Sequence, residues 1–146
     1  MTEQRVLATS RELPFTASQI YAAFASAEQL ACWWGPQGFT NTFEIFDFVV
    51  GGRWKFVMHG PDGSNYQNES YFEHLEPNAK IVIRHDCPPY FRLHIHLVPT
   101  EQGTQLLWQQ EFDDAATAQA VKQIVGPANE QNLDRLTAVL KRQGVQ

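Results

Sequence analysis

The sequence predicts an α+β domain in which a curved antiparallel sheet of six or seven strands packs around a long C-terminal helix. Two observations predict it: segments of alternating apolar and polar residues follow one another over residues 43–112, and an apolar stripe at helical spacing follows them. A sheet and a helix that are each apolar on one side bury those sides against each other. A chain of 146 residues has the size of one domain, so we expect a single domain over residues 1–146.

A strand and two short helices are expected before the series of strands. The strand is expected over residues 4–13, because Pro14 lacks the N–H group that a strand ladder needs. Thr16 or Ser18 can cap a helix that follows directly, and a second short helix is expected over residues 28–32.

Alternating patterns separated by turn residues predict the remaining strands. Trp54, Phe56 and Met58 alternate with more polar neighbours, which gives a strand with one apolar face. The Pro-Asp-Gly sequence at residues 61–63 is typical of the tight turns that join such strands. The strands are expected over residues 43–46, 53–58, 66–75, 81–85, 91–98 and 105–112.

The last segment predicts a long helix with one interruption. Asp113 or Asp114 can cap it, and the stripe that would face the sheet continues to the residues near the end of the chain. The Gly-Pro sequence at residues 126–127 is expected to interrupt the helix, because proline removes a helical hydrogen bond. The stripe begins with Val121, Ile124 and Val125 before the interruption and continues through Leu133, Leu136 and Leu140 after it.

Charge and composition argue against several classes of partner. Eleven basic and sixteen acidic residues give a formal net charge of −5, without the basic cluster that binds successive phosphates, so no nucleic-acid partner is expected. The sequence has no secretion signal and no apolar run of membrane-spanning length, so we expect a cytoplasmic protein without a membrane partner. Cys32 and Cys87 are expected to be free thiols.

The aromatic content predicts a cavity. Ten Phe, four Trp and four Tyr are more large flat side chains than a compact core needs, and a curled sheet need not pack tightly on its helix everywhere. Any one candidate could instead belong to an ordinary core, because alternation reports only burial. The expected lining residues are Trp34, Trp54, Phe56, Met58, Tyr66, Ser70, Phe72, Ile83, His85, Leu93, Ile95, Trp108, Gln110 and Phe112.

Polar residues at strand positions whose side chains are expected to point to the inner face of the sheet are the ones that can orient a ligand. His85, Ser70, Gln110 and Asn68 occupy such positions, and Tyr66 is expected at the rim. A buried polar side chain must find hydrogen-bond partners, which a ligand or the protein itself can supply.

A metal site is the weaker interpretation of the histidines. His94 and His96 share one face of a strand, and His85 and Cys87 repeat that spacing on the preceding strand. A zinc site needs three or four converging ligands. The apolar neighbours of His94 and His96, which are Leu93, Ile95 and Leu97, are expected on the inner face of the sheet. We therefore expect no metal and no cofactor, with His94 and His96 on the outer face.

Five short segments carry a family resemblance. They resemble the START-like (SRPBCC) superfamily and, more narrowly, bacterial domains similar to the C-terminal domain of the activator of heat-shock protein 90 ATPase. The resemblance implies a Bet v 1-like helix-grip fold with a hydrophobic cavity. Members of the superfamily bind lipids, sterols, polyketides or plant hormones, or act as cyclases. The segments are Trp33-Trp34-Gly35, Gly51-Gly52-Arg53-Trp54, Pro61-Asp62-Gly63, Glu76-Pro77 and residues 129–136.

Three functions remain open on this basis. The first hypothesis is non-enzymatic binding of a small hydrophobic or aromatic ligand, with His85 or Tyr66 orienting its polar end. The second is a cyclase- or hydrolase-type enzyme that uses the same cavity, with His85, Tyr66 or Glu69 as the titratable group. The third is an interaction protein, either a chaperone regulator or a homodimer formed through an exposed sheet edge or aromatic patch.

Overall fold

The computed structural model describes residues 5–144 and contains one antiparallel sheet of seven strands. The strand order is β1-β7-β6-β5-β4-β3-β2, so β1 and β2 form the two edges. This architecture confirms the predicted fold class, although residue 4, where the first strand was expected to begin, lies outside the described residues. The strands are β1 (Val6–Leu13), β2 (Thr40–Phe46), β3 (Arg53–His59), β4 (Asn65–Glu76), β5 (Lys80–His85), β6 (Phe91–Thr100) and β7 (Gly103–Phe112).

Two short helices follow the first strand, as predicted. They are α1 (Ala17–Ala25) and α2 (Ala27–Trp33). Of the two expected caps, Thr16 is the one used: its hydroxyl accepts from the Gln19 amide at 3.1 Å, and the Gln19 side chain accepts from the Thr16 amide at 2.8 Å. This reciprocal capping box fixes the start of α1 directly after the first strand.

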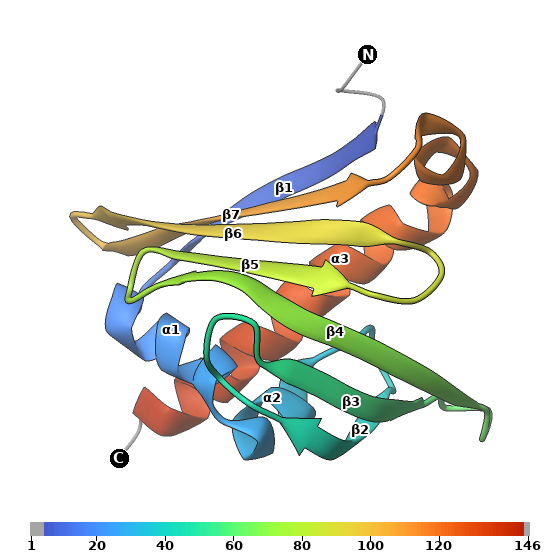
Figure 1. Cartoon of the computed structure of the whole chain (residues 1–146). Helices are drawn as coiled ribbons and strands as arrows, with labels where there is room; N and C mark the ends of the chain where they lie inside the picture. The colour runs from blue at the N-terminus through green and yellow to red at the C-terminus, as the bar shows by residue number, and fades with distance from the viewer. Residues whose placement is uncertain (1–4, 145–146) are drawn as a thin grey trace.

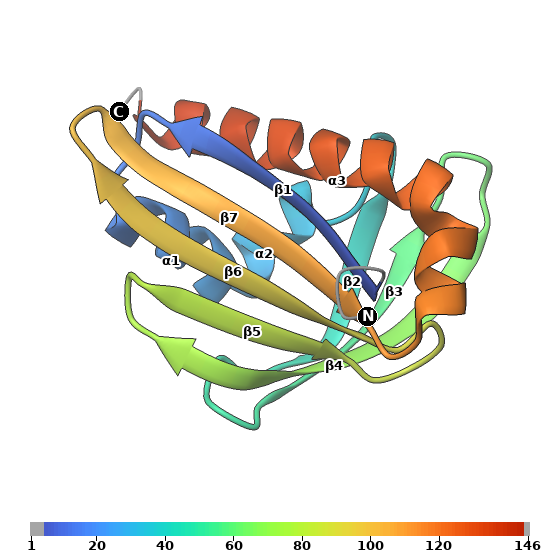
Figure 2. The ribbon, with the colours of Figure 1, turned by 90° about the horizontal axis from the view of Figure 1, so that it is seen from above.

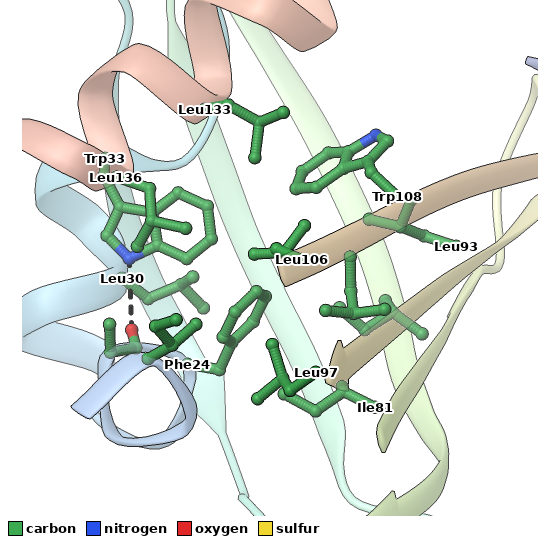
Figure 3. Close-up of a cluster of buried hydrophobic side chains, with 14 of the residues drawn as sticks. Phe24, Leu30, Trp33, Ile81, Leu93, Leu97, Leu106, Trp108, Leu133 and Leu136 are labelled. Atoms are coloured by element: carbon green, nitrogen blue, oxygen red, sulfur yellow. Dashed lines mark hydrogen bonds between the residues drawn. The ribbon is translucent and has the colours of Figure 1, made fainter. Parts of the chain in front are cut away.

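The long helix α3 (Ala115–Gly144) lies along the concave side of the sheet (Figure 1). The short helices α1 and α2 contact α3 and lie next to its C-terminal half. The part of the predicted stripe that follows Pro127 is confirmed, because Leu133, Leu136 and Leu140 are all buried. Figure 3 shows Leu133 and Leu136 from α3 meeting Trp33 from α2 and side chains from the sheet. The core of the molecule is therefore concentrated under the second half of α3.

The predicted alternation along β6 is also confirmed. Leu93, Ile95 and Leu97 are buried, whereas His94 and His96 between them lie half-buried on the other face of the sheet. On that outer face, His94 Nε2 lies 3.1 Å from a carboxylate oxygen of Glu111. The concave face is thus apolar along its centre.

The prediction of an interrupted C-terminal helix is wrong, because α3 is continuous with Pro127 inside it. Proline cannot donate to the carbonyl one turn earlier and its ring pushes that carbonyl away, which bends a helix without having to end it. Figure 2 shows the first turns of α3 set at an angle to the rest. The prediction that Ile124 belongs to the apolar stripe is wrong, because Ile124 lies just before the bend, where α3 leaves the line of its buried half, and is 73% exposed.

Candidate functional site

A hollow of about 190 Å³ lies between the sheet and the bent part of α3. We call it the inner hollow. Its wall comes from the concave ends of β3 to β7, from the loop after α2 and from α3 around Pro127. The lining residues are Trp34, Gly35, Pro36, Met58, Asn68, His85, Phe91, Leu93, Trp108, Gln110, Val125, Ala128, Asn129 and Asn132.

A second, more open hollow of about 630 Å³ adjoins the first, and we call it the outer hollow. The two share five lining residues, so the outer hollow is the mouth of the inner one. Tyr66 lines this mouth and is 48% exposed, in agreement with its expected place at a rim. The shared residues are Pro36, Met58, Asn68, His85 and Phe91.

The bend in α3 accounts for the position of the inner hollow. After the bend, Leu133 and Leu136 pack directly on the sheet and leave no room. At the bend, Val125, Ala128 and Asn129 line the hollow, and the short side chain of Ala128 fills little of the space below it. The helix therefore closes the core at one end and stands off the sheet at the other.

Arg135 fixes the loop after α2, residues 34–39, which forms one rim of the hollow and which we call the rim loop. Its guanidinium donates to five backbone carbonyls at 2.8 to 3.1 Å, those of Cys32, Trp34, Gly35, Pro36 and Phe39. Burial lowers the pKa of Arg135 from its ordinary value, but a guanidinium stays protonated in proteins. One side chain of α3 thus holds the rim loop in place through hydrogen bonds to its carbonyl groups.

Gly35 and Asn132 complete the attachment of this loop. Gly35 has a φ of +95°, and a Cβ placed there would lie 2.7 Å from the Met58 Cε atom, so glycine is required. Its amide donates to Asn132 Oδ1 at 3.3 Å, and Asn132 Nδ2 donates to the Trp33 carbonyl at 2.8 Å. The rim next to Trp34 is therefore built from hydrogen bonds to α3.

His85 is the titratable group at the junction of the two hollows. Its ring stacks on Phe91 at a centroid distance of 4.4 Å, Nδ1 lies 2.7 Å from the Pro89 carbonyl, and Nε2 lies 2.9 Å from Asn68 Oδ1. Burial is the largest effect on its pKa and lowers it below 6.5, so the ring is neutral at neutral pH. The Pro89 carbonyl and Asn68 Oδ1 can both only accept, so the single proton of the neutral ring is donated to one of these two oxygens.

The lowered pKa of His85 makes stability depend on pH. The unfolded chain binds a proton that the folded protein resists, so the free energy of unfolding is expected to fall as the pH drops below about 6.5, by at most about 1.4 kcal/mol per pH unit for one histidine. His96, whose pKa burial also lowers, acts in the same direction. When the free energy of unfolding is measured by urea unfolding at a series of pH values, its slope against pH should be smaller in His85→Gln than in the wild-type protein. An equal slope in His85→Gln would contradict the assignment.

Gln110 and Asn129 form the second polar group of the inner hollow. The Gln110 side chain is buried, and its Oε1 accepts from Asn129 Nδ2 at 3.0 Å. This bond joins β7 to the bend of α3 across the hollow. Trp108, which forms part of the aromatic wall, lies two residues before Gln110 on the same face of β7.

The predicted lining residues fall into two groups. Trp34, Met58, His85, Leu93, Trp108 and Gln110 line the inner hollow, and Tyr66 lines the outer one. The other candidates also point to the inner face of the sheet and are buried, but they lie elsewhere along the curved strands and line neither hollow. These are Trp54, Phe56, Ser70, Phe72, Ile83, Ile95 and Phe112.

The lining residues that the prediction did not include come mainly from α3 and the rim loop. Polar Asn129 and Asn132 lie within two turns of the apolar stripe. Polar residues beside the apolar face of a helix are the sequence feature that could have indicated these lining residues. No pattern marked Ala128 as a lining residue, since a small side chain has no directional signature. The additional residues are Gly35, Pro36, Phe91, Val125, Ala128, Asn129 and Asn132, with Asn68 considered only as a polar candidate.

The other candidates for chemistry, Glu69 and the two cysteines, do not line either hollow. Glu69 pairs with Arg53 at 2.9 Å on the outer face of the sheet, where both side chains are about half exposed. Cys87 Sγ lies 3.4 Å from His85 Nε2. Within residues 5–144, no group of three or more His, Cys, Asp or Glu side chains is placed to hold a metal ion. Cys32 and Cys87 are free thiols.

Fold and site together define a class of protein. A curved antiparallel sheet that grips a long C-terminal helix, with two short helices after the first strand, is the helix-grip fold of START-like (SRPBCC) domains. The profile of one family in this class, described as Activator of Hsp90 ATPase homolog 1-like protein, matches residues 14–141, and the chain belongs to that family. No curated protein matches the sequence significantly.

Solved structures of bacterial proteins share the fold at low sequence identity. A crystal structure from Nitrosomonas europaea has a TM-score of 0.91 at 17% identity and covers 100% of both chains. A solution structure from Arthrobacter aurescens has a TM-score of 0.88 at 22% identity, covering 97% of this chain and 89% of that one. The AHSA1-like protein from Aeromonas hydrophila has a TM-score of 0.77 at 17% identity, with coverages of 97% and 95%. In the described part of this chain, no helix is both long and apolar enough to span a membrane.

Proposed function

We propose that this protein binds a small apolar or aromatic molecule in the inner hollow and does so without catalysing a reaction. The observation that carries the proposal is the hollow itself, about 190 Å³ of space under the bend of α3 with a predominantly apolar wall. An apolar cavity of about 150 Å³ is enough to hold benzene. A ligand of one or two rings fits the inner hollow, and any extension of it would project into the mouth.

Aromatic side chains favour a flat ligand. Trp34 and Trp108 lie on the wall with ring centroids 6.2 Å apart and planes tilted by 37°, and Phe91 lies at the junction with the mouth. Rings arranged in this way offer both faces and edges to an aromatic guest. The stacked pair of His85 and Phe91 leaves the histidine beside the path between the two hollows.

The composition of the wall favours binding over catalysis. Of the residues that line the two hollows, only His85 and Tyr66 have titratable side chains, and neither is paired with a carboxylate in the wall. Hydrolysis and cyclisation generally need an acid and a base placed at the reacting atoms. A lone neutral imidazole that already contacts Pro89 and Asn68 is better suited to fixing the orientation of a ligand.

Filling the hollow should abolish binding. In a ¹H–¹⁵N titration of the wild-type protein, neutral aromatic probes such as naphthalene are expected to shift the signals of Trp108 and Leu93. Ala128→Phe places a ring in the inner hollow and should remove these shifts, whereas Ala120→Phe, on an exposed position of the same helix, should retain them. Shifts that survive in Ala128→Phe, or a wild-type protein that responds to no probe, would contradict the proposal.

The family description supports a second candidate, stimulation of the Hsp90 ATPase. The measurement is the ATPase rate of the bacterial Hsp90 with and without this protein, together with a direct binding assay. Stimulation that persists in Ala128→Phe would favour this function over ligand binding.

We further propose that the protein acts in the cytoplasm, where thiols such as Cys32 and Cys87 stay reduced.

A further inference from the structure

The polar side chains in the wall of the two hollows are all uncharged at neutral pH. Neither wall includes Asp, Glu, Lys or Arg. A charged group in the inner hollow would lose its hydration without gaining a counter-charge, which is strongly unfavourable. The wall therefore selects an uncharged occupant, and its polar groups indicate which kind.

Three of these polar side chains are already engaged by the protein. Asn132 uses its oxygen for the Gly35 amide and its nitrogen for the Trp33 carbonyl. Asn68 Nδ2 donates to the Tyr66 carbonyl at 3.1 Å, and its Oδ1 contacts His85. Since both ring nitrogens of His85 also have neighbours, the side chains of the inner hollow that still have an open polar group are Gln110 and Asn129.

Gln110 presents an unused amide group to the hollow. Its side chain is 93% buried, and its Nε2 donates to no residue within 5–144. The fully enclosed polar side-chain atoms without a partner in that range are Asn41 Oδ1 and the indole nitrogens of Trp54 and Trp108, so Gln110 Nε2 keeps access to the space that Gln110 lines. Asn129 Oδ1 is open in the same way. Exchanging the oxygen and nitrogen assignments of both amides still leaves one donor and one acceptor.

We propose that Gln110 and Asn129 together bind a neutral group that both donates and accepts a hydrogen bond, such as a phenolic hydroxyl or a carboxamide, carried on an aromatic ligand. The ring system would lie against Trp34 and Trp108, and its polar group would close the amide pair into a hydrogen-bonded ring. This inference rests on the proposed function, since it specifies the ligand of the same hollow.

Three probes of one shape test the inference: 2-naphthol, naphthalene and 2-naphthoate. At about pH 7 the naphthol is neutral, like a tyrosine side chain, and the naphthoate is charged. We expect 2-naphthol to bind about tenfold tighter than naphthalene, the worth of one net hydrogen bond, and 2-naphthoate to bind most weakly. Gln110→Met should remove the preference for naphthol, whereas Gln109→Met, on the exposed face of the same strand, should keep it.

A readout in the wild-type protein makes the test independent of how well Gln110→Met folds. The side-chain NH₂ signals of Gln110 and Asn129 should move with 2-naphthol and stay in place with naphthalene. Equal affinity for these two probes would overturn the inference and leave binding in the hollow intact. Tightest binding of 2-naphthoate would also overturn it, and failure of all three probes would remove the proposed function as well.

Discussion

Replacing Arg135 with Met is expected to lower the free energy of unfolding by about 3 kcal/mol, because it removes a charged donor from five carbonyls at once. Arg135→Lys should recover only part of the loss, since a single ammonium group cannot reach all five acceptors. Urea unfolding measures both. The matched control is Arg142→Met, on an exposed position of the same helix, which should change stability by less than about 0.5 kcal/mol.

The Arg135 substitutions also connect stability to the site. The rim loop includes Trp34, Gly35 and Pro36, which line the inner hollow, so loosening it should weaken binding of neutral aromatic probes along with stability. A variant that loses stability and keeps full probe affinity would show that the loop does not form part of the binding site.

Trp54→Ala should have the second large effect, a loss of about 3–5 kcal/mol in the free energy of unfolding. Trp54 is fully buried and its ring contacts five aromatic neighbours, so truncation leaves a large cavity that neighbouring rings cannot fill. Trp34→Ala, at the half-buried wall of the hollow, should cost less stability and should weaken probe binding more. The reverse order of the two stability losses would show that the wall and the core have been assigned the wrong way round.

This contrast also shows how far the sequence predicts the site. Alternation assigns Trp54, Phe56 and Met58 to the same face, and the structure confirms that parity. It does not say where along a curved strand the sheet parts from the helix, and only Met58, near the end of β3, reaches the hollow. Parity is a local property of one strand, whereas the hollow results from curvature and from a helix far away in the sequence.

The bend in α3 determines where the inner hollow lies, and the sequence predicts a disturbance at this position but not a bend. Gly126-Pro127 was correctly singled out as a disturbance, but its predicted effect, an interruption, is wrong because one lost hydrogen bond bends a long helix that is otherwise anchored on both sides. The anchors include Ala118 before the bend, which is fully buried, and Leu133, Leu136 and Arg135 after it. The five carbonyl contacts of Arg135 had no sequence signal, because an arginine next to an apolar stripe usually faces solvent.

Xenon binding tests the central claim most directly, because xenon enters apolar cavities without needing hydrogen bonds. In crystals of the protein equilibrated under xenon pressure, we expect a xenon atom beneath the bend of α3, between Trp34, Trp108 and Ala128. Side-chain density that closes the space between Trp108 and Ala128, with no xenon there, would contradict the account.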